Sequence, residues 1–342
     1  MKKTSLIVDA SPVFYRFAYS SISYAKNKLK LKPNDNGIYP FNEYKDIFIY
    51  SVINSVSSMK QKFFADEIIL AVDTKPYWRT DIWAGYKHGR KSNDKSGIDW
   101  NALSDAIQEI LDLLNENSNI RVIRIPGIEG DDVLFVLSEE LSKRGNEVIV
   151  KSIDHDIYYC LAYENVKYWQ VKHNVKDKKC GFVQFNESEL NKMKFEHIFF
   201  GDSGDNIFPV TAFTQFSEKF KEIYPEMTEL KAWPKRFEID QSFIQKYGES
   251  AYKHPRFGAK SYYKKRDKEG FTDEDFLNRN PIHKLNLELN KKISLPEYIP
   301  NEIREKIISE YDKNHPEKNA GKLNEYFLQN NLFNLIGKIP QL

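Results

Sequence analysis

Carboxylate side chains recur in this sequence just after apolar segments and at the starts of amphipathic ones. Asp154 and Asp156 follow the apolar run 148–153, and Asp9 and Asp73 lie at the ends of two similar runs. Carboxylates repel one another, so gathering nine of them in one cleft would be unfavourable without a bound cation. The pattern therefore predicts a divalent-metal site. Its candidate ligands are Asp9, Asp73, Glu129, Asp131, Asp132, Asp154, Asp156, Asp202 and Asp205.

Oxygen ligands of this kind suit Mg²⁺, with Mn²⁺ as a substitute. Because Mg²⁺ takes few protein ligands and keeps several waters, nine acids imply two ions. Paired divalent ions suit phosphoryl displacement, in which one activates water and the other stabilises the leaving oxygen. A single Asp after a strand is usually a turn or N-cap residue, and Asp131 and Asp132 could simply complement a helix dipole. Repetition of the pattern at five places favours the metal interpretation.

A basic and aromatic segment at residues 75–95 begins two residues after Asp73. Cations that neutralise phosphates and aromatic rings that stack on unpaired bases are what single-stranded nucleic acid requires. The alternative is a solvated loop whose aromatic residues anchor it to the core. The closeness of Asp73 favours nucleic-acid binding. The segment's cations are Lys75, Arg79, Lys87, Arg90, Lys91 and Lys95, and its aromatic residues are Tyr77, Trp78, Trp83 and Tyr86.

The first half of the chain alternates strand-like and helix-like patterns. Apolar or β-branched runs predict parallel strands at 5–8, 67–72, 120–125, 147–153 and 166–171. Apolar residues at helical spacing predict helices over about 44–59 and 100–114, the second capped by Asp99, and a third starting near Gly130. This alternation indicates a doubly wound, mostly parallel α/β sheet. Ligands bind beyond the carboxyl ends of such strands, so the acids are expected to converge there.

The composition changes from about residue 211, where apolar strands give way to Lys, Glu, Tyr and Phe. Segments 301–311 and 322–333 are helical by pattern, whereas 289–300 is predicted to be extended. Asp202 and Asp205 are three residues apart, so one helical turn would place both on the same side. We therefore expect an α/β domain over 1–206 and a smaller, mostly helical region over 207–342.

Bulk properties exclude several classes of protein. No apolar stretch reaches the length of a membrane span or of a signal peptide. The only two cysteines, Cys160 and Cys180, make neither a disulfide framework nor a four-ligand zinc site, which predicts the reducing cytoplasm. The net charge is only +2, but the surface would be basic if a metal neutralised the nine acids, as expected for binding a polyanion. The glycine motifs of dinucleotide-binding and P-loop proteins are absent.

Taken in order, the motifs resemble the flap endonuclease/5′→3′ exonuclease family, which has a PIN-like fold, and most closely its stand-alone ribonuclease H members from T-even-like phages. The matching motifs are Asp9 at the end of the first strand, Asp73 before Arg79-x₆-Tyr86-Lys87-x₂-Arg90, Glu129-Gly130-Asp131-Asp132, Asp154-x-Asp156 and Gly201-Asp202-x-x-Asp205-Asn206. The family's glycine-rich hairpin does not follow Asn206. Its second half is expected at 257–261, after an insertion at 211–255, within a diverged helix-hairpin-helix-like DNA-binding part of the 207–342 region.

The resemblance implies roles for individual residues. Arg79 and Lys87 would grip the scissile phosphate at the base of an arch over 75–95, and Tyr86 would stack near the frayed end. Arg90 and Lys91 would also contact nucleic acid. His155 is not expected to bind metal, because in an extended segment it would point away from its neighbours. The inner metal would be held by Asp9, Asp73, Glu129, Asp131, Asp154 and Asp156, and the outer metal by Asp132, Asp202 and Asp205.

The expected activity is that of a metal-dependent 5′→3′ exonuclease, ribonuclease H and flap endonuclease, which removes RNA primers and 5′ flaps during DNA replication. Its substrates would be DNA and RNA–DNA duplexes with 5′ ends or flaps, and its partners a single-strand-binding protein and a sliding clamp. We expect a monomer without membrane association, in the host-cell cytoplasm if it is phage-encoded. Two alternatives stay open: a non-catalytic nucleic-acid-binding protein on the same scaffold, and a PIN-type single-strand ribonuclease.

Overall fold

The computed structural model describes residues 2–87, 96–170, 181–212, 222, 246, 257–313 and 315–342. The chain divides into two compact units. Unit 1 comprises Met1–Lys75, Asn93–Phe185 and Asn301–Leu342, and unit 2 comprises Pro76–Ser92 and Asn186–Pro300. These boundaries do not coincide with the one expected at residue 206, so the division into a nuclease domain and a C-terminal region stays a prediction. Most of the expected 211–255 insertion lies outside the described residues.

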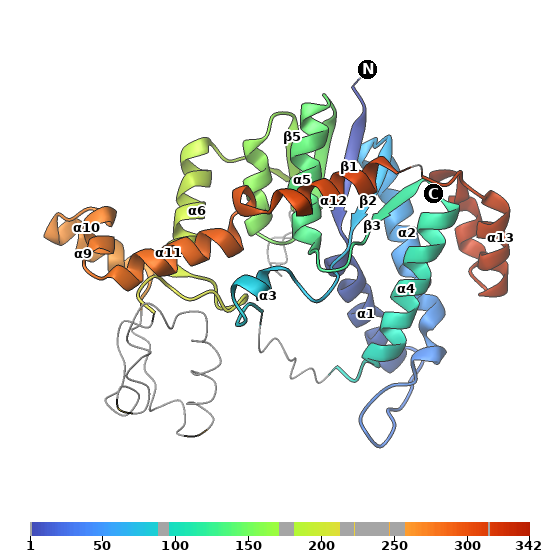
Figure 1. The fold of residues 1–342 in the computed structure, drawn as a ribbon. Coiled ribbons are helices and arrows are strands. Elements are labelled where there is room, and N and C mark those ends of the chain that lie inside the picture. Colours follow the sequence, from blue (N-terminus) through green and yellow to red (C-terminus); the bar gives the residue numbers. More distant parts are fainter. Residues whose placement is uncertain are drawn as a thin grey trace. The chain divides into compact units, whose positions relative to one another are not determined.

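Unit 1 is built on a six-stranded sheet with the strand order β3-β2-β1-β4-β5-β6 (Figure 1). All neighbouring pairs are parallel except β5 and β6, which are antiparallel. The five strands expected from the sequence are confirmed to within a few residues, and the short edge strand β6 was not expected. The strands are β1 Thr4–Asp9, β2 Glu67–Ala71, β3 Ile120–Ile123, β4 Glu147–Ser152, β5 Val166–Gln170 and β6 Gly181–Val183.

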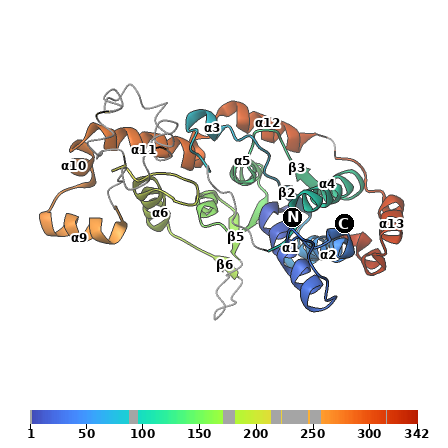
Figure 2. The same cartoon turned by 90° about the horizontal axis from the view of Figure 1, so that it is seen from below.

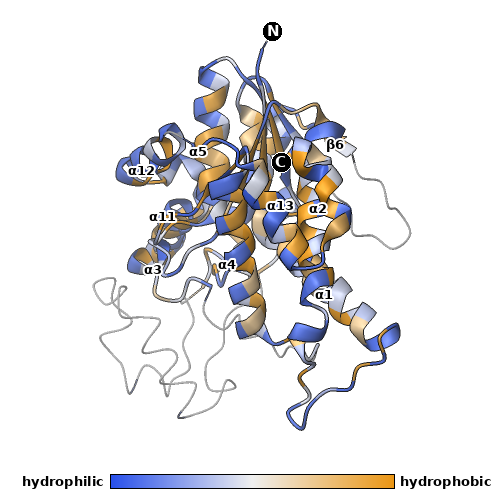
Figure 3. Cartoon of the chain, turned by 90° about the vertical axis from the view of Figure 1, so that its right-hand side faces the viewer, coloured by the Kyte–Doolittle hydropathy of each residue, from blue (hydrophilic) through white to orange (hydrophobic). Residues whose placement is uncertain are grey.

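Helices cover both faces of the sheet, which confirms the doubly wound α/β class. Alternate side chains of β1 face opposite layers: Leu6 and Val8 join the large core beneath α1, α2 and α4. The helices α5 and α12 lie on the other side of the strands from α2 and α13 (Figure 3). The elements are α1 Ala10–Asn27, η1 Phe41–Glu43, α2 Lys45–Phe63, α4 Trp100–Asn117, α5 Gly130–Lys143, η2 Asp156–Ala162, α12 Asn301–Asp312, α13 Ala320–Gln329 and η7 Phe333–Gln341.

Local signals explain where several of these helices begin and end. The Asp99 side chain accepts a hydrogen bond from the backbone of Ala102, which confirms the expected N-cap of α4. Helix α1, which the sequence patterns did not reveal, starts directly after Asp9 and so follows the first strand without a loop. Helix α2 ends at Phe63, and the C-cap residue Phe64 adopts a left-handed backbone conformation with φ +50° and is 88% exposed. A glycine would occupy this position with less strain.

Unit 2 is helical in its described part, and its core is unusually aromatic. Phe199, Tyr262 and Leu277 come together from α6, α9 and α10, and α6 and α10 pack against α11 (Figure 2). The buried Asn290 amide donates to the carbonyls of Ile198 and Phe208, which fixes α11 against the end of α6. The helices are α3 Arg79–Ile82, α6 Glu187–Phe200, α9 Ala259–Glu269, α10 Asp273–Asn278, α11 Pro281–Ser294 and η6 Pro296–Tyr298.

One segment differs from its predicted conformation. Residues 289–300 were expected to be extended, but α11 continues to Ser294 and η6 covers Pro296–Tyr298. Pro281 at the first turn and the Asn280 cap start a helix that runs on to Ser294. The helices predicted at 301–311 and 322–333 are confirmed in most of their length as α12 and α13. Within the described parts of the chain, every helix is too short or too polar to cross a bilayer.

Candidate metal and nucleic-acid sites

Asp9 ends β1 and is almost fully buried at the carboxyl edge of the sheet. Ser152, at the end of neighbouring β4, donates a hydrogen bond of 2.7 Å to the Asp9 Oδ2 atom. Burial raises the pKa of Asp9 to about 7; the Ser152 hydrogen bond opposes this rise, and the charges of Asp73 and Asp154 add to it. An ionised Asp9 is therefore destabilised in this environment, and a bound cation would relieve that cost.

Asp73 lies just beyond β2, the strand on the other side of β1. Its Oδ2 atom accepts a hydrogen bond of 2.7 Å from the Ser11 hydroxyl, and its Oδ1 atom accepts one of 2.8 Å from the Gly130 N–H. The Gly130 backbone approaches so closely that an added Cβ would lie 3.3 Å from the Ala71 carbonyl oxygen. Asp73 is thus held between the first turns of α1 and α5.

Glu129 and Asp132 form a reciprocal cap at the start of α5. The Glu129 side chain accepts from the Asp132 backbone, and the Asp132 Oδ2 atom accepts from the Glu129 N–H at 3.2 Å. Both side chains are fully buried, whereas Asp131 between them is half-buried. The capping explanation considered for this acidic stretch therefore applies to two of its acids, because their carboxylates bind the first backbone N–H groups of the helix.

Asp154 and Asp156 lie in the loop after β4 and at the start of η2. The Asp154 N–H donates to the Ser152 hydroxyl at 3.1 Å, and the Asp156 N–H donates to the Asp154 Oδ1 atom at 3.0 Å. Tyr168 donates through its hydroxyl to the Asp154 carbonyl at 2.8 Å. His155 has a helical backbone and stacks on Tyr158, so the expectation that it lies in an extended segment was wrong.

These contacts bring three predicted acids into electrostatic range at one edge of the sheet in unit 1. Asp9, Asp73 and Asp154 follow the three adjacent strands β1, β2 and β4, and two of them raise the pKa of the third. Asp9 is buried, whereas Asp73 and Asp154 are exposed. Mutually repulsive carboxylates at the mouth of such a site fit a hard divalent cation better than a neutral ligand. The donor set of unit 1 therefore fits the expected Mg²⁺ or Mn²⁺.

In unit 2, the described part of the basic aromatic segment packs against the Asp205 loop. The Lys87 Nζ atom lies 3.7 Å from the Asp205 Oδ2 atom, and the Tyr86 hydroxyl donates to the same oxygen at 3.2 Å. The Lys87 ammonium also lies 5.3 Å and 5.1 Å from the ring centres of Tyr77 and Tyr86. The aromatic residues here anchor the segment and also lie close to its cation. Anchoring of the loop and binding of nucleic acid, the two interpretations of this segment, are therefore compatible.

Arg79, predicted to grip phosphate, is only 5% exposed. Its Nε atom donates to the Ile293 carbonyl at 2.8 Å, and its guanidinium lies over the ring of Trp78 at 4.4 Å. The Arg79 guanidinium is therefore positioned by protein groups before any contact with nucleic acid. Arg90, Lys91 and Lys95 lie outside the described residues.

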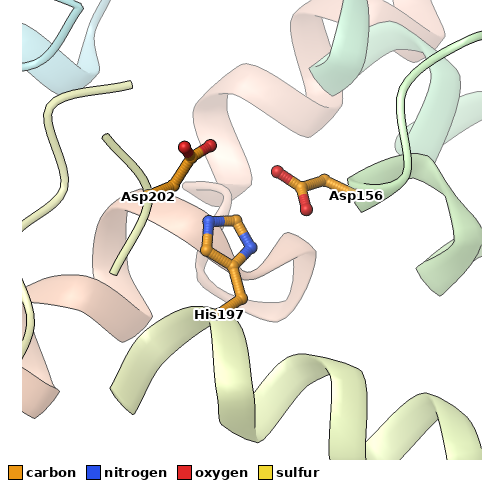
Figure 4. A group of neighbouring side chains, drawn as sticks. All are labelled: Asp156, His197 and Asp202. Atoms are coloured by element: carbon orange, nitrogen blue, oxygen red, sulfur yellow. The ribbon is translucent and has the colours of Figure 1, made fainter. Parts of the chain in front are cut away.

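Asp202 follows the glycine that ends α6. Its backbone N–H and carbonyl both pair with Ile207, and its Oδ1 atom accepts from the Gly204 N–H at 2.7 Å. The helical turn expected across Asp202 and Asp205 is therefore wrong, because this pairing closes a tight loop instead. His197, on the last turn of α6, offers a ring nitrogen within 4.8 Å of an Asp202 carboxylate oxygen (Figure 4, which also draws Asp156 of unit 1).

Sequence patterns had not singled out Ser11, Ser152 or His197. Ser11 follows Asp9 by two residues, and Ser152 ends the strand before Asp154, so both could have been proposed as hydrogen-bond donors to the acids. His197 gives no such signal, because its distance from Asp202 depends on how the chain leaves α6.

Comparison with known proteins identifies the family. Residues 4–192 match the model of the 5′–3′ exonuclease, N-terminal resolvase-like domain, which is more than half of the chain. The chain belongs to this family. The resemblance drawn from the motifs is thereby confirmed, and so is the expected PIN-like class of fold.

Relatives and a solved structure agree with this placement. Ribonuclease H of Enterobacteria phage T4 is 29% identical over 153 residues, which are 44% of this chain and 48% of that protein. A 5′–3′ exonuclease of Buchnera aphidicola (subsp. Acyrthosiphon pisum) is 28% identical over 128 residues, or 37% and 42% of the two chains. The matches thus span about half the length of these relatives or less. The T5 D15 protein, co-crystallised with metal ions, shares the fold, with a TM-score of 0.51 and 15% identity over 90% of this chain and 97% of that one.

Proposed function

We propose that this protein is a metal-dependent 5′→3′ exonuclease and flap endonuclease with ribonuclease H activity, which removes RNA primers and 5′ flaps during DNA replication. The observation that carries the proposal is the buried Asp9, whose pKa is raised to about 7 beside Asp73 and Asp154 in a chain of the 5′–3′ exonuclease family. The names of the T4 and Buchnera relatives support the same substrate class. The cytoplasmic location expected from the sequence is part of this proposal.

Two Mg²⁺ ions, replaceable by Mn²⁺, are the proposed cofactors. In unit 1 they would use Asp9, Asp73, Glu129, Asp131, Asp154 and Asp156, with Asp132 in the outer group implied by the family resemblance. That group also contains Asp202 and Asp205 of unit 2, and Asp202 has His197 as a neighbouring donor. When bound, the ions would supply Lewis acidity for water activation and for the leaving oxygen.

The protein's own groups have definite tasks in this scheme. Ser152 and Ser11 orient the carboxylates of Asp9 and Asp73 through hydrogen bonds of 2.7 Å each. Such hydrogen bonds fix the direction of the carboxylates before any ion or substrate arrives. Lys87 and Arg79 are the proposed cationic contacts of the scissile phosphate, where preorganised charge stabilises the transition state more than the bound substrate. Tyr86, Arg90 and Lys91 are the further proposed contacts of nucleic acid.

Helix α9 is the proposed duplex contact of the C-terminal region. Lys260, Lys264 and Lys268 are exposed and recur every fourth residue, which places them along one face of the helix. A four-residue step advances about 6 Å along a helix, close to the spacing of successive phosphates in a strand. Changing each lysine to glutamine is expected to weaken binding to flapped duplex DNA for any sequence, and to reduce the slope of log K against log salt by about 1 per residue.

The activity is tested with a panel of 5′-labelled nicked duplex, 5′-flap and RNA–DNA substrates in Mg²⁺. Asp156→Asn is expected to slow cleavage by roughly 10²-fold or more, as loss of a group that acts at the reacting phosphate does. The matched control is Asp112→Asn, an exposed acid paired with Arg124, which should leave the rate unchanged. If Asp156→Asn hydrolysed these substrates at a near wild-type rate, the proposed nuclease function would be refuted.

The same panel separates the two alternatives. Binding of all substrates without turnover in either Mg²⁺ or Mn²⁺ would favour a non-catalytic nucleic-acid-binding protein. Preferential cleavage of single-stranded RNA loops over 5′ flaps would favour a PIN-type ribonuclease. A monomeric state and contacts with a single-strand-binding protein and a sliding clamp belong to the proposal and are measured by light scattering and by pull-down with the purified partners.

A further inference from the structure

Two loops of unit 2 are fastened together around Lys87. The Lys87 N–H donates to the Asp205 carbonyl at 2.9 Å, and the Asn206 side chain donates to the Gly85 carbonyl at 2.7 Å. The Trp83 indole N–H donates to the Asn206 carbonyl at 3.3 Å. These hydrogen bonds join residues that are more than a hundred positions apart in the chain.

Each loop also contains a residue in an unusual backbone conformation. Lys87 has φ +52° and Asn206 has φ +59°, both in the left-handed region. Asn tolerates this region, whereas a long side chain such as Lys enters it at a cost of about 1 kcal/mol. Such conformations persist where surrounding contacts determine them, and they gather at functional sites. At Lys87 the determining contacts come from Asp205.

Asp205 holds Lys87 through both its backbone and its side chain. Its carboxylate oxygen Oδ2 faces the Lys87 ammonium at 3.7 Å and accepts from the Tyr86 hydroxyl at 3.2 Å. The side chains of Lys87 and Asp205 are only 12% and 16% exposed, so solvent screens their attraction less than at an open surface. In the same loop, the Asp202 side chain accepts a hydrogen bond from the Gly204 N–H.

We propose that Asp205 is a positioning residue for Lys87, rather than the metal ligand that the family resemblance implies. Asp205 orders the Lys87 ammonium beside the rings of Tyr77 and Tyr86, and Lys87 then meets the substrate phosphate. Only the predicted effect of Asp205 on the cleavage rate rests on the proposed nuclease function. The ordering of Lys87 is a property of unit 2 itself.

A first experiment tests the ordering without any activity. Lysines are reductively methylated with ¹³C, and the Lys87 methyl signal is assigned by its loss in Lys87→Ala. In the wild-type protein the signal should be displaced upfield by the two tyrosine rings. Asp205→Asn should move it to the main lysine envelope, whereas Asp202→Asn should leave it displaced. Tyr86→Phe, which keeps the ring but removes the hydroxyl, is the control for general disruption of the loop. It should retain most of the displacement.

A second experiment tests the role in catalysis by a double-mutant cycle. Asp205→Asn and Lys87→Ala should each lower the single-turnover rate at least tenfold, and the double variant should be no more than about threefold slower than the slower single one. Asp202→Asn should instead combine multiplicatively with Lys87→Ala and raise the Mg²⁺ concentration for half-maximal rate. Asp205→Asn should leave that concentration within about twofold.

The outcomes are distinguishable. An unmoved Lys87 signal in Asp205→Asn, or multiplicative rates together with a raised Mg²⁺ requirement, overturns the positioning role. A wild-type protein that cleaves no 5′-end substrate refutes the proposed function, and the methyl signal still decides whether Asp205 orders Lys87.

Discussion

Replacement of Asp9 by asparagine should stabilise the metal-free protein at neutral pH. The folded state raises the pKa of Asp9 from 3.8 to about 7, chiefly by burial, so ionisation is unfavourable in the native site. Asparagine keeps an oxygen that can accept the 2.7 Å hydrogen bond from Ser152 and carries no charge. A shift of about three pKa units corresponds to at most about 4 kcal/mol at 1.36 kcal/mol per unit.

The direction of the pH dependence of stability follows from proton binding to Asp9. Between about pH 4 and pH 7 the native state holds a proton on Asp9 that the unfolded state has lost, so the free energy of unfolding falls as the pH rises through this window. Asp9→Asn has no such proton and lacks this part of the pH dependence. The stability difference between variant and wild type should therefore grow from pH 4 to pH 7 in favour of the variant and level off above it.

Urea denaturation in EDTA at several pH values measures this difference, and parallel curves in MgCl₂ measure the effect of the ion. Added Mg²⁺ should stabilise the wild-type protein more than Asp9→Asn. An ion that binds the native state stabilises it more when it binds more tightly, and the variant lacks one carboxylate ligand. Asp112→Asn, at an exposed acid, is the matched control and should show neither effect. Equal pH dependence for wild type and Asp9→Asn in EDTA would refute the reasoning.

Two further variants test other parts of the structure. Asp132→Ala should lower the free energy of unfolding by about 1–2 kcal/mol in EDTA, because it removes a buried cap of α5, and Asp131→Ala should not; equal effects in urea titrations would contradict the capping assignment. Phe64→Gly should raise the melting temperature, with a gain of about 1 kcal/mol, since glycine relieves the left-handed strain at the end of α2; a lower melting temperature would show that the exposed ring makes a stabilising contact.

The positions of five strands could be predicted because parallel strands buried on both faces leave uninterrupted apolar runs. The same reasoning placed Asp9, Asp73 and Asp154 at one edge, and their electrostatic coupling in unit 1 agrees with it. Helix α1 escaped prediction because its exposed positions include Tyr15, Tyr19 and Tyr24, which blur its apolar stripe. The turn at Asp202 was missed because a spacing of three fits a helix and a closed loop equally well, and only the pairing with Ile207 decides.

Capping and metal binding make different demands on the same acids. A cap uses carboxylate lone pairs to accept from the helix's own N–H groups, whereas a metal ligand must also keep a lone pair directed at the ion. At the start of α5 the buried Glu129 and Asp132 bind each other's backbone, while Asp131 between them is only half-buried. The same comparison separates Asp205, which faces Lys87 and Tyr86, from Asp202 in the same loop, whose side chain accepts from the Gly204 N–H. Because an acidic motif records only the residue types, it cannot tell these two kinds of carboxylate apart; the hydrogen bonds around each one can.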